Sequence, residues 1–353
     1  MKMAYATDAA PVAGSSLLLE LSLEHPELPA LEADAFAGWR GDECTVAGRR
    51  VAIIRTGNRS GAAGEYASSL AFTMRVSALH GVYDSWEALR KGVSQLALSI
   101  KGESACIRVA SGGPGGKVES ERELGALLAG HCPVKLVKPD REIRVVTEAG
   151  SHCLAIKSAD VDRRALDSRQ AKYRQFFSPI SISPRFARAF LNICGARRGK
   201  RVLDPFCGTG GIAMEAVLLG ADVVGSDIDG RMVEGTALNL RQIGLERGWE
   251  LHRLDVGEIG SLGSFDAVVT DPPYGRSSFA NRESIAALYS RALDAISECL
   301  KPGGLLGIVV PDPSLIHATS EMRLKSMVSH RVHRSLTRHF IVMEKGSVSR
   351  TGH

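Results

Sequence analysis

The sequence predicts an α/β protein whose C-terminal half is a doubly wound, mostly parallel sheet, preceded by a smaller mixed α+β region. After Lys200, short apolar strands alternate with helical segments, which is typical of a parallel sheet with helices on both faces. The carboxyl ends of parallel strands form the edge at which such sheets bind ligands. Aspartates stand at the ends of four of the expected strands: Asp204, Asp227, Asp255 and Asp271.

The composition limits the class of protein. A chain of 353 residues with 44% hydrophobic and 24% charged residues is long enough for two or three domains and too apolar for global disorder. No stretch approaches the roughly 18 apolar residues of a membrane span, and residues 1–16 lack the apolar core of a signal peptide. The seven cysteines are odd in number and form no C-x-x-C pair. We therefore expect a cytoplasmic protein with neither disulfides nor bound metal.

The N-terminal region is expected to contain both strands and helices. We expect strands over 17–21, 51–55, 72–79, 105–110, 134–137, 142–147 and 152–157. A helix follows Pro29, a second runs from Ser85 to Ile100, and a third spans 121–128. Ser85 is a suitable N-cap, and the apolar residues after it repeat at helical spacing. This order of elements suits a small α+β domain.

In the C-terminal region a helix is expected from Ser183, with Pro184 in its first turn. We then expect strands over 201–203, 221–226, 250–254, 265–270 and 305–310, and a β-hairpin over 328–337 and 339–344. Helices are expected over 211–219, 230–243 and 282–300. The connecting residues 161–182 are polar and charged and are expected to form a basic linker.

A glycine-rich turn, Asp204–Gly211, lies between an expected strand and an expected helix. Its glycines permit close approach of a ligand to the backbone, and a helix N-terminus favours an anionic group. The turn lacks the Gly-Lys-Ser/Thr of a P-loop, and Asp204 would repel a pyrophosphate but could hold an ammonium group. Asp227 could accept hydrogen bonds from ribose hydroxyls and Asp255 from an adenine amine, although each could instead cap a helix. The combination predicts an S-adenosylmethionine pocket.

The second motif is Asp271-Pro272-Pro273-Tyr274, at the end of the fourth strand. Two prolines remove backbone donors and stiffen the turn, so the Asp271 carboxylate and the Pro272 carbonyl remain as acceptors for an exocyclic amine. Tyr274 offers a ring for stacking. Such a site works by positioning and electrostatics, with the proton passing to Asp271 or to water. The alternative is a proline-rich turn with a buried tyrosine.

The Asp271–Tyr274 motif resembles the [Asn/Asp/Ser]-Pro-Pro-[Tyr/Phe/Trp] motif of amino methyltransferases. Together with 204–211, 225–229, 231–233 and 239–240 it is similar to archaeal-type THUMP-domain tRNA guanine-N2 methyltransferases. The resemblance implies a ferredoxin-like segment over 17–80, a THUMP RNA-binding domain over 81–160 and a Rossmann-like class I methyltransferase domain over 183–353. It also implies methylation of tRNA guanosine 10, once or twice on N2, with S-adenosylmethionine as cofactor. The stretch 176–179 resembles the family's segment that lines the cofactor pocket.

The motifs and the resemblance together give three sets of expected site residues. The catalytic residues are Asp271, Pro272, Pro273 and Tyr274. The cofactor-binding residues are Phe177, Ser178, Pro179, Asp204, Phe206, Cys207, Gly208, Thr209, Gly210, Asp227, Ile228, Asp255 and Asp271. The RNA-binding residues are Lys135, Lys138, Arg141, Arg174, Arg185 and Arg276.

Charge is concentrated where RNA binding would need it. Residues 161–201 hold 11 Lys/Arg against 2 Asp/Glu, in a chain whose net charge is +5. Phosphate contacts supply much of the affinity of RNA-binding proteins, although a solvated helix face would show the same charges. We expect a monomer that binds tRNA and no membrane. The alternatives are an enzyme that methylates another RNA guanosine or a DNA adenine or cytosine, and a tRNA-binding protein with an inactive methyltransferase fold.

Overall fold

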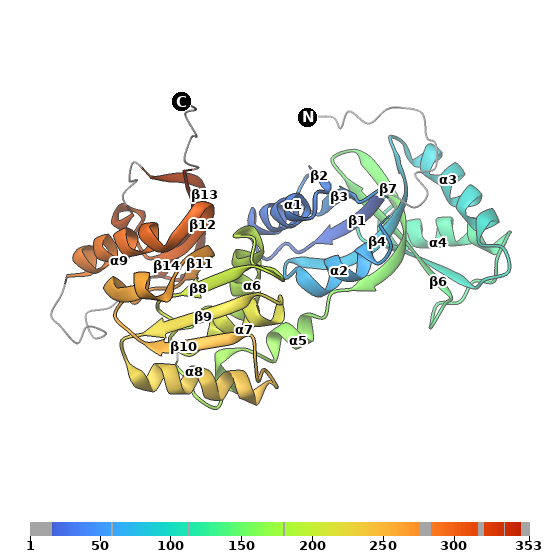
Figure 1. The fold of residues 1–353 in the computed structure, drawn as a ribbon. Helices are drawn as coiled ribbons and strands as arrows, with labels where there is room; N and C mark the ends of the chain where they lie inside the picture. Colours follow the sequence, from blue (N-terminus) through green and yellow to red (C-terminus); the bar gives the residue numbers. More distant parts are fainter. Residues whose placement is uncertain are drawn as a thin grey trace, which may run out of the picture. The chain divides into compact units, whose positions relative to one another are not determined.

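The computed structural model divides into two compact units, Met1–Asp162 and Arg163–His353 (Figure 1). It describes residues 16–57, 59–111, 113, 115–178, 181–274, 284–316, 321–334 and 336–346. Each unit is built on one seven-stranded sheet.

The first unit has the sheet order β2-β3-β1-β4-β7-β6-β5. Its strands are β1 (Ser16–Leu21), β2 (Glu43–Ala47), β3 (Val51–Arg55), β4 (Thr73–Tyr83), β5 (Ala105–Val109), β6 (Arg141–Glu148) and β7 (Ser151–Asp160). Its helices are α1 (Leu28–Arg40), α2 (Ala62–Ser69), α3 (Trp86–Ser99) and α4 (Lys117–Ala129). Strands β5 and β6 run parallel, and the other neighbouring pairs run antiparallel. The Ser85 side chain caps α3 as expected, because it accepts a hydrogen bond from the Ala88 N–H at 3.2 Å.

The sheet of the first unit has two different faces, because successive side chains along a strand point to opposite sides. On one face, Leu19 of β1 packs with Phe36 of α1 and Tyr66 of α2, and α3 and α4 form a further core with β5, β6 and β7. On the other face, Leu18 joins Val146 in a core whose members all lie in strands or directly beside them. We call this second face the inner face of the first unit.

The second unit has the sheet order β10-β9-β8-β11-β12-β14-β13. Its strands are β8 (Arg201–Asp204), β9 (Asp222–Asp227), β10 (Trp249–Arg253), β11 (Phe265–Thr270), β12 (Leu300–Val310), β13 (Met322–His333) and β14 (Leu336–Lys345). Its helices are α5 (Arg163–Asp167), η1 (Ala171–Tyr173), α6 (Pro184–Ile193), α7 (Gly211–Leu218), α8 (Gly230–Gln242), η2 (Val256–Leu262), α9 (Ile285–Cys299) and η4 (Pro313–Leu315). Strands β8 to β12 pair in parallel, and β14 runs antiparallel to both of its neighbours.

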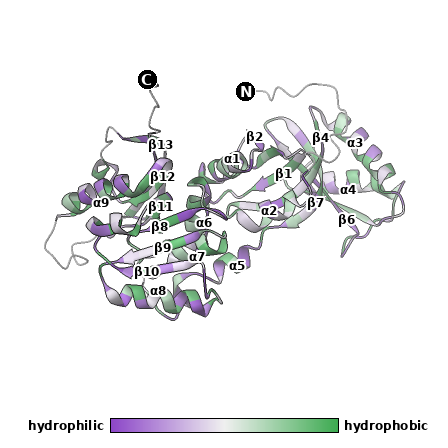
Figure 2. Ribbon diagram, in the orientation of Figure 1, coloured by the Kyte–Doolittle hydropathy of each residue, from purple (hydrophilic) through white to green (hydrophobic). Residues whose placement is uncertain are grey.

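Helices cover both faces of this second sheet, so the expected doubly wound fold is confirmed. Leu306 and Ile308 of β12 pack with α9 in the main core. Gly307 lies between them and faces the other side, where an added Cβ would lie 2.5 Å from the Cys194 sulfur and 3.0 Å from the ring of Phe190 in α6. Figure 2 shows β11 and β12 as largely hydrophobic, as expected for strands buried on both faces.

The structure differs from the sequence-based expectations at several places. Residues 134–137 form only an isolated bridge between Val134 and Ala105 instead of a strand. The sequence analysis missed β2 and α2. The expected boundary between residues 80 and 81 lies inside β4, a strand that pairs with β1 on one side and β7 on the other. The expected linker 161–182 contains α5 and η1, and the hairpin turn falls after His333, earlier than expected.

No helix in the described part of the chain is long and apolar enough to cross a membrane. Within the same residues, no group of three His, Cys, Asp or Glu side chains is placed to hold a metal ion.

The close contact at Gly307 gives a testable prediction on stability. Gly307→Ala should lower the free energy of unfolding by about 1–3 kcal/mol, the usual cost of overpacking a core. Gly260→Ala is the matched control, because an added Cβ there meets no atom within 4 Å. Urea unfolding of both variants would measure the difference. An unchanged midpoint for Gly307→Ala would show that α6 can move away from the sheet at little cost.

Candidate active site

Four aspartates lie at or just beyond the carboxyl ends of neighbouring parallel strands. Asp204 and Asp227 are the last residues of β8 and β9, and Asp271 directly follows β11. Asp255 comes two residues after β10 and caps η2. Because β10, β9, β8 and β11 are adjacent in the sheet, the four carboxylates share one edge, which we call the acidic edge.

The glycine turn between β8 and α7 is fixed in place by a contact with Thr236 of α8. Gly208 and Gly210 adopt φ values of +51° and +79°, which residues with a Cβ rarely adopt. The Thr236 hydroxyl of α8 donates to the Gly208 carbonyl at 2.8 Å. A Cβ on Gly210 would lie 2.8 Å from the Thr236 methyl carbon. The turn is therefore packed against α8, and a side chain at Gly210 would require Thr236 to move.

Asp227 is oriented by backbone donors. Its carboxylate oxygens accept hydrogen bonds from the N–H groups of Gly208, at 3.1 Å, and Asp229, at 2.9 Å. Burial raises the pKa of Asp227, and these two bonds oppose that shift. The arrangement fixes an acceptor beside the glycine turn, where a ribose would lie.

Asp204 is the most deeply buried carboxyl of the acidic edge, with 2% of its surface exposed. It accepts hydrogen bonds from the Thr270 hydroxyl at 2.8 Å and from the Phe206 N–H at 3.3 Å. Burial raises the pKa of Asp204 to about 7, and the charges of Asp271 and Asp227 act in the same direction. Such a group favours a cationic ligand, because a nearby positive charge stabilises its ionised form.

Asp255 has partners within the protein. Its carboxylate accepts a hydrogen bond from the Gly257 N–H at 2.8 Å, which is the helix-capping interaction left open as an alternative by the sequence. It also forms an ion pair with Arg291 of α9. A hydrogen bond to an adenine amine would have to be made beside these two partners.

The segment before α6 is fixed to the glycine turn by α8. The Asn239 amide accepts a hydrogen bond from the Phe176 N–H at 2.9 Å and donates to the carbonyls of Phe176, at 2.8 Å, and Thr209, at 3.0 Å. The Gln242 amide likewise accepts a hydrogen bond from the Gln175 N–H and donates one to the Tyr173 carbonyl. The sequence analysis missed these two amides as site residues, although the resemblance had included Asn239 in its matching string.

The remaining expected cofactor residues have different environments. Phe177 and Ile228 are 54% and 47% exposed, so both can contact a ligand. Ser178 is partly buried, as is Phe206, which packs against the main core of the second unit. Pro179 lies outside the described residues. Cys207 is 4% exposed and burial raises the pKa of its thiol well above the usual value, which fits a packing role.

The expectation for Arg174 needs correction. This arginine is 8% exposed and donates to the Thr209 hydroxyl at 3.0 Å, so it supports the glycine turn from inside the protein. Nearby, Glu215 of α7 is bound by both Arg169 and Arg188. Three of the 11 Lys and Arg residues in the basic stretch 161–201 therefore stabilise the second unit internally.

The other expected RNA-binding residues are at the surface or outside the described residues. Lys135, Lys138 and Arg141 are exposed in the first unit, and Arg141 is paired with Glu103. Arg185 is partly exposed and paired with Asp167. Arg276 lies outside the described residues.

The turn Asp271–Tyr274 lies at the acidic edge beside the glycine turn, because β11 pairs with β8. The Tyr274 hydroxyl donates a hydrogen bond to one Asp271 oxygen. The guanidinium of Arg338 in β14 lies 3.6 Å from the other oxygen and 5.9 Å from the centre of the Tyr274 ring. Burial raises the pKa of Asp271, while Arg338 and Tyr274 oppose that shift. Pro272 is buried, so the turn is anchored in the fold.

The environment of Asp204 predicts that its ionised form destabilises the folded protein but favours binding of a cationic ligand. Because the folded protein holds a proton on Asp204 up to about pH 7 and the unfolded chain only up to about pH 4, stability should fall as pH rises between these values. Asp204→Asn should raise the melting temperature at pH 8 but have little effect near pH 4. The same change should weaken binding of S-adenosylmethionine about tenfold or more. Calorimetry and thermal unfolding at the two pH values would measure both effects, and a variant less stable at pH 8 would contradict the assignment.

Proteins similar in sequence to this chain are methyltransferases. A family model described as an RMKL-like methyltransferase domain matches residues 171–339. The chain is similar to the tRNA (guanine(10)-N2)-dimethyltransferase of Methanothermobacter thermautotrophicus, with 34% identity over 93% of this chain and 99% of the relative. It is also similar to the tRNA (guanine(6)-N2)-methyltransferase of Thermus thermophilus, with 31% identity over 56% of this chain and 58% of the relative.

Among solved structures, the crystal structure of TrmN from Thermus thermophilus matches with a TM-score of 0.56 and 23% identity, over 94% of this chain and 99% of that chain. That likeness shows the fold. The chain is a methyltransferase, and S-adenosylmethionine is its methyl donor. Because the similarity to the Methanothermobacter enzyme runs through both units, the chain belongs to the family of tRNA (guanine(10)-N2)-dimethyltransferases.

Proposed function

We propose that the protein methylates the exocyclic N2 amine of a guanosine in tRNA, at position 10, once or twice. The observation that carries this proposal is the buried Asp271 carboxylate at the tip of β11, held beside the glycine turn by Tyr274 and Arg338. An anionic acceptor at this place suits a substrate that presents an N–H₂ group.

S-adenosylmethionine supplies a methyl group activated by its attachment to a positively charged sulfur. On the protein side, Asp227 would accept hydrogen bonds from the ribose, and its own backbone bonds preset its orientation. Asp204 would hold the ammonium group, and Ile228 and Phe177 offer exposed apolar surface to the adenine and its surroundings. The Asn239 clamp keeps segment 173–178 beside the glycine turn.

The substrate amine would donate hydrogen bonds to Asp271 and to the Pro272 carbonyl, and the base would stack on Tyr274. Positioning of this kind turns the nitrogen lone pair towards the donor methyl and lowers the barrier chiefly through orientation and electrostatics. The proton that the nitrogen loses would pass to Asp271 or to water. A guanine within a helix would first have to leave its base pair.

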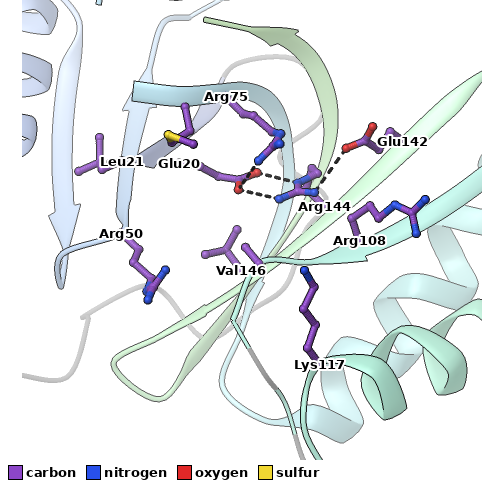
Figure 3. A pocket seen from close by; sticks show the side chains of 11 residues that line it. Glu20, Leu21, Arg50, Arg75, Arg108, Lys117, Glu142, Arg144 and Val146 are labelled. Carbon is purple, nitrogen blue, oxygen red and sulfur yellow. Dashed lines mark hydrogen bonds and ion pairs between the residues drawn. The ribbon is translucent and has the colours of Figure 1, made fainter. Parts of the chain in front are cut away.

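A basic pocket in the first unit supports RNA binding. It has a volume of about 450 Å³ and lies on the inner face. At its base Arg144 and Glu20 form a bidentate ion pair with both contacts at 2.7 Å. Figure 3 shows Arg50, Arg108 and Lys117 around this pair. Arg75 and Glu142 also line the pocket and pair with Glu20 and Arg144, respectively. The five cations of the lining outnumber its two carboxylates, which suits RNA phosphates.

The exposed basic segment 134–140 is tied to this pocket. Arg108 donates a hydrogen bond to the Leu136 carbonyl at 3.0 Å, so Lys135 and Lys138 lie on a segment that Arg108 helps to fix. We propose that the pocket and this segment bind the tRNA backbone, and that the first unit contains a ferredoxin-like part and a THUMP-like part whose boundary does not divide β4. We further propose that the protein works in the cytoplasm as a monomer.

Another tRNA guanosine is the second candidate substrate, because the chain is also similar to an enzyme named for guanine 6. Mass-spectrometric nucleoside mapping of tRNA from a deletion strain tests both proposals. Loss of N2-methylguanosine at position 10 supports the first, and loss at another guanosine supports the second. Methylation of duplex DNA but not of tRNA by the purified protein would contradict both.

The catalytic assignment predicts the behaviour of Asp271→Ala. This change should reduce methylation of tRNA by about 10²–10⁴-fold, the usual contribution of a positioned proton acceptor. Binding of S-adenosylmethionine should stay nearly intact, because Asp204 and Asp227 are untouched. Incorporation of labelled methyl groups and calorimetry measure the two effects. Full activity in this variant would show that Asp271 does not hold the amine.

The basic pocket predicts a change in the salt dependence of tRNA binding. In the double variant Arg108→Ala/Lys117→Ala, the slope of log Kd against log salt concentration should fall by about 2, because each phosphate contact contributes roughly one unit. Arg55→Ala is the control, since Arg55 is paired with Glu43 outside the pocket. Fluorescence anisotropy at several salt concentrations would measure the slopes. Equal slopes for all three proteins would exclude the pocket from the RNA interface.

A further inference from the structure

Arg338 is a buried arginine that reaches the catalytic turn from the C-terminal hairpin. Its side chain is 10% exposed and ion-pairs with Asp271 at 3.6 Å. The same guanidinium lies over the Tyr274 ring. It thus contacts both polar side chains of the turn at once.

The sheet topology explains how a residue so distant in the sequence reaches this place. Strand β14 runs antiparallel to β12, and His339 pairs with Val310 at the carboxyl end of β12. The beginning of β14 therefore lies at the acidic edge. Arg338 is on the same side of the strand as Phe340, whose ring packs on Phe186 and Phe190 of α6, and this packing fixes the face from which the arginine approaches.

Some groups around Asp271 favour its protonated form, and others favour its ionised form. Asp204, at the end of β8, adds like charge. Tyr289 of α9 is 1% exposed and near enough for the charge of Asp271 to raise its pKa. Tyr274 donates a hydrogen bond from the turn itself. Arg338 brings the positive charge that offsets the burial of Asp271.

We propose that Arg338 is a positioning residue for methyl transfer, whose guanidinium keeps the Asp271 carboxylate ionised and fixed so that it accepts the hydrogen bond of the substrate amine. The inference rests on the proposed function and assigns a residue to it. An ionised carboxylate has only acceptors, whereas a protonated one would present a donor to the amine. The charge of Arg338 therefore determines whether the turn can hold an N–H₂ group.

The test compares Arg338→Met, Arg338→Lys and Arg331→Met with the wild-type protein. Arg331 is the matched control, because it is an exposed arginine of the same hairpin, opposite Thr337. The measurements are kcat and KM for tRNA across pH, calorimetric binding of S-adenosylmethionine, and titration of the Asp271 carboxyl by ¹³C NMR with Asp271→Asn as the assignment standard.

We expect Arg338→Met to lower kcat at neutral pH by about tenfold or more, with cofactor binding and KM for tRNA little changed. The acidic limb of its kcat profile should move to higher pH, because removal of the positive charge raises the pKa of Asp271. Arg338→Lys should restore most of the pH profile, since it keeps the charge. Arg331→Met should keep the wild-type acidic limb.

Three outcomes would overturn the inference. A lower melting temperature with unchanged kcat and unchanged pH profile would make Arg338 a stabilising residue only. A raised KM alone would make it an RNA contact. An Asp271 titration that does not move in Arg338→Met would remove the electrostatic link, even if the wild-type protein proved inactive on tRNA. Inactivity of the wild-type protein on tRNA would contradict the proposed function but not the electrostatic link, because the NMR titration of Asp271 needs no activity.

Discussion

The site depends on the cost of placing several carboxylates at one edge of a sheet. Like charges in a poorly solvated place repel one another, so each needs a donor or a cation. Asp227 receives backbone N–H groups, Asp255 receives Arg291 and Asp271 receives Arg338. Asp204 accepts hydrogen bonds from two neutral donors, the Phe206 N–H and the Thr270 hydroxyl, and burial raises its pKa to about 7. A positively charged ligand at the acidic edge would therefore stabilise the ionised form of Asp204.

Both units contain buried or largely buried arginines that form ion pairs with a buried glutamate. In the first unit Arg144 neutralises Glu20 beneath a basic pocket, whereas Arg50 and Arg108 of the lining have longer ion pairs, with Glu148 at 3.9 Å and with Glu121 at 3.8 Å. In the second, Arg169 and Arg188 both pair with the buried Glu215 of α7, the helix that follows the glycine turn. In both units, some arginines are therefore paired with acids inside the protein. The number of basic residues in these sequence segments thus overstates the positive charge at the surface.

Much of the second unit could be predicted from sequence, because its strands are apolar, its turns are rich in glycine and proline, and its acids follow the strands. The positions of the four aspartates and of the turn Asp271–Tyr274 at the ends of strands were predicted in this way. The roles of Arg174 and Arg338 could not be, since a charged residue in a one-dimensional pattern looks the same whether it is solvated or buried. Arg338 reaches Asp271 only through the antiparallel return of β14. Strand β2 is largely exposed and α2 is short, so neither shows a strong periodic pattern.

The clamp around Asn239 has a consequence for how the enzyme responds to its surroundings. Amide groups do not titrate and are little affected by ionic strength, so the bonds from Asn239 and Gln242 persist in acid and in concentrated salt. The carboxylates of the edge behave oppositely. The position of segment 173–178 beside the glycine turn therefore depends less on pH than the charge of the acidic edge does. Acidification would weaken the attraction of the edge for a positively charged ligand without breaking these amide hydrogen bonds.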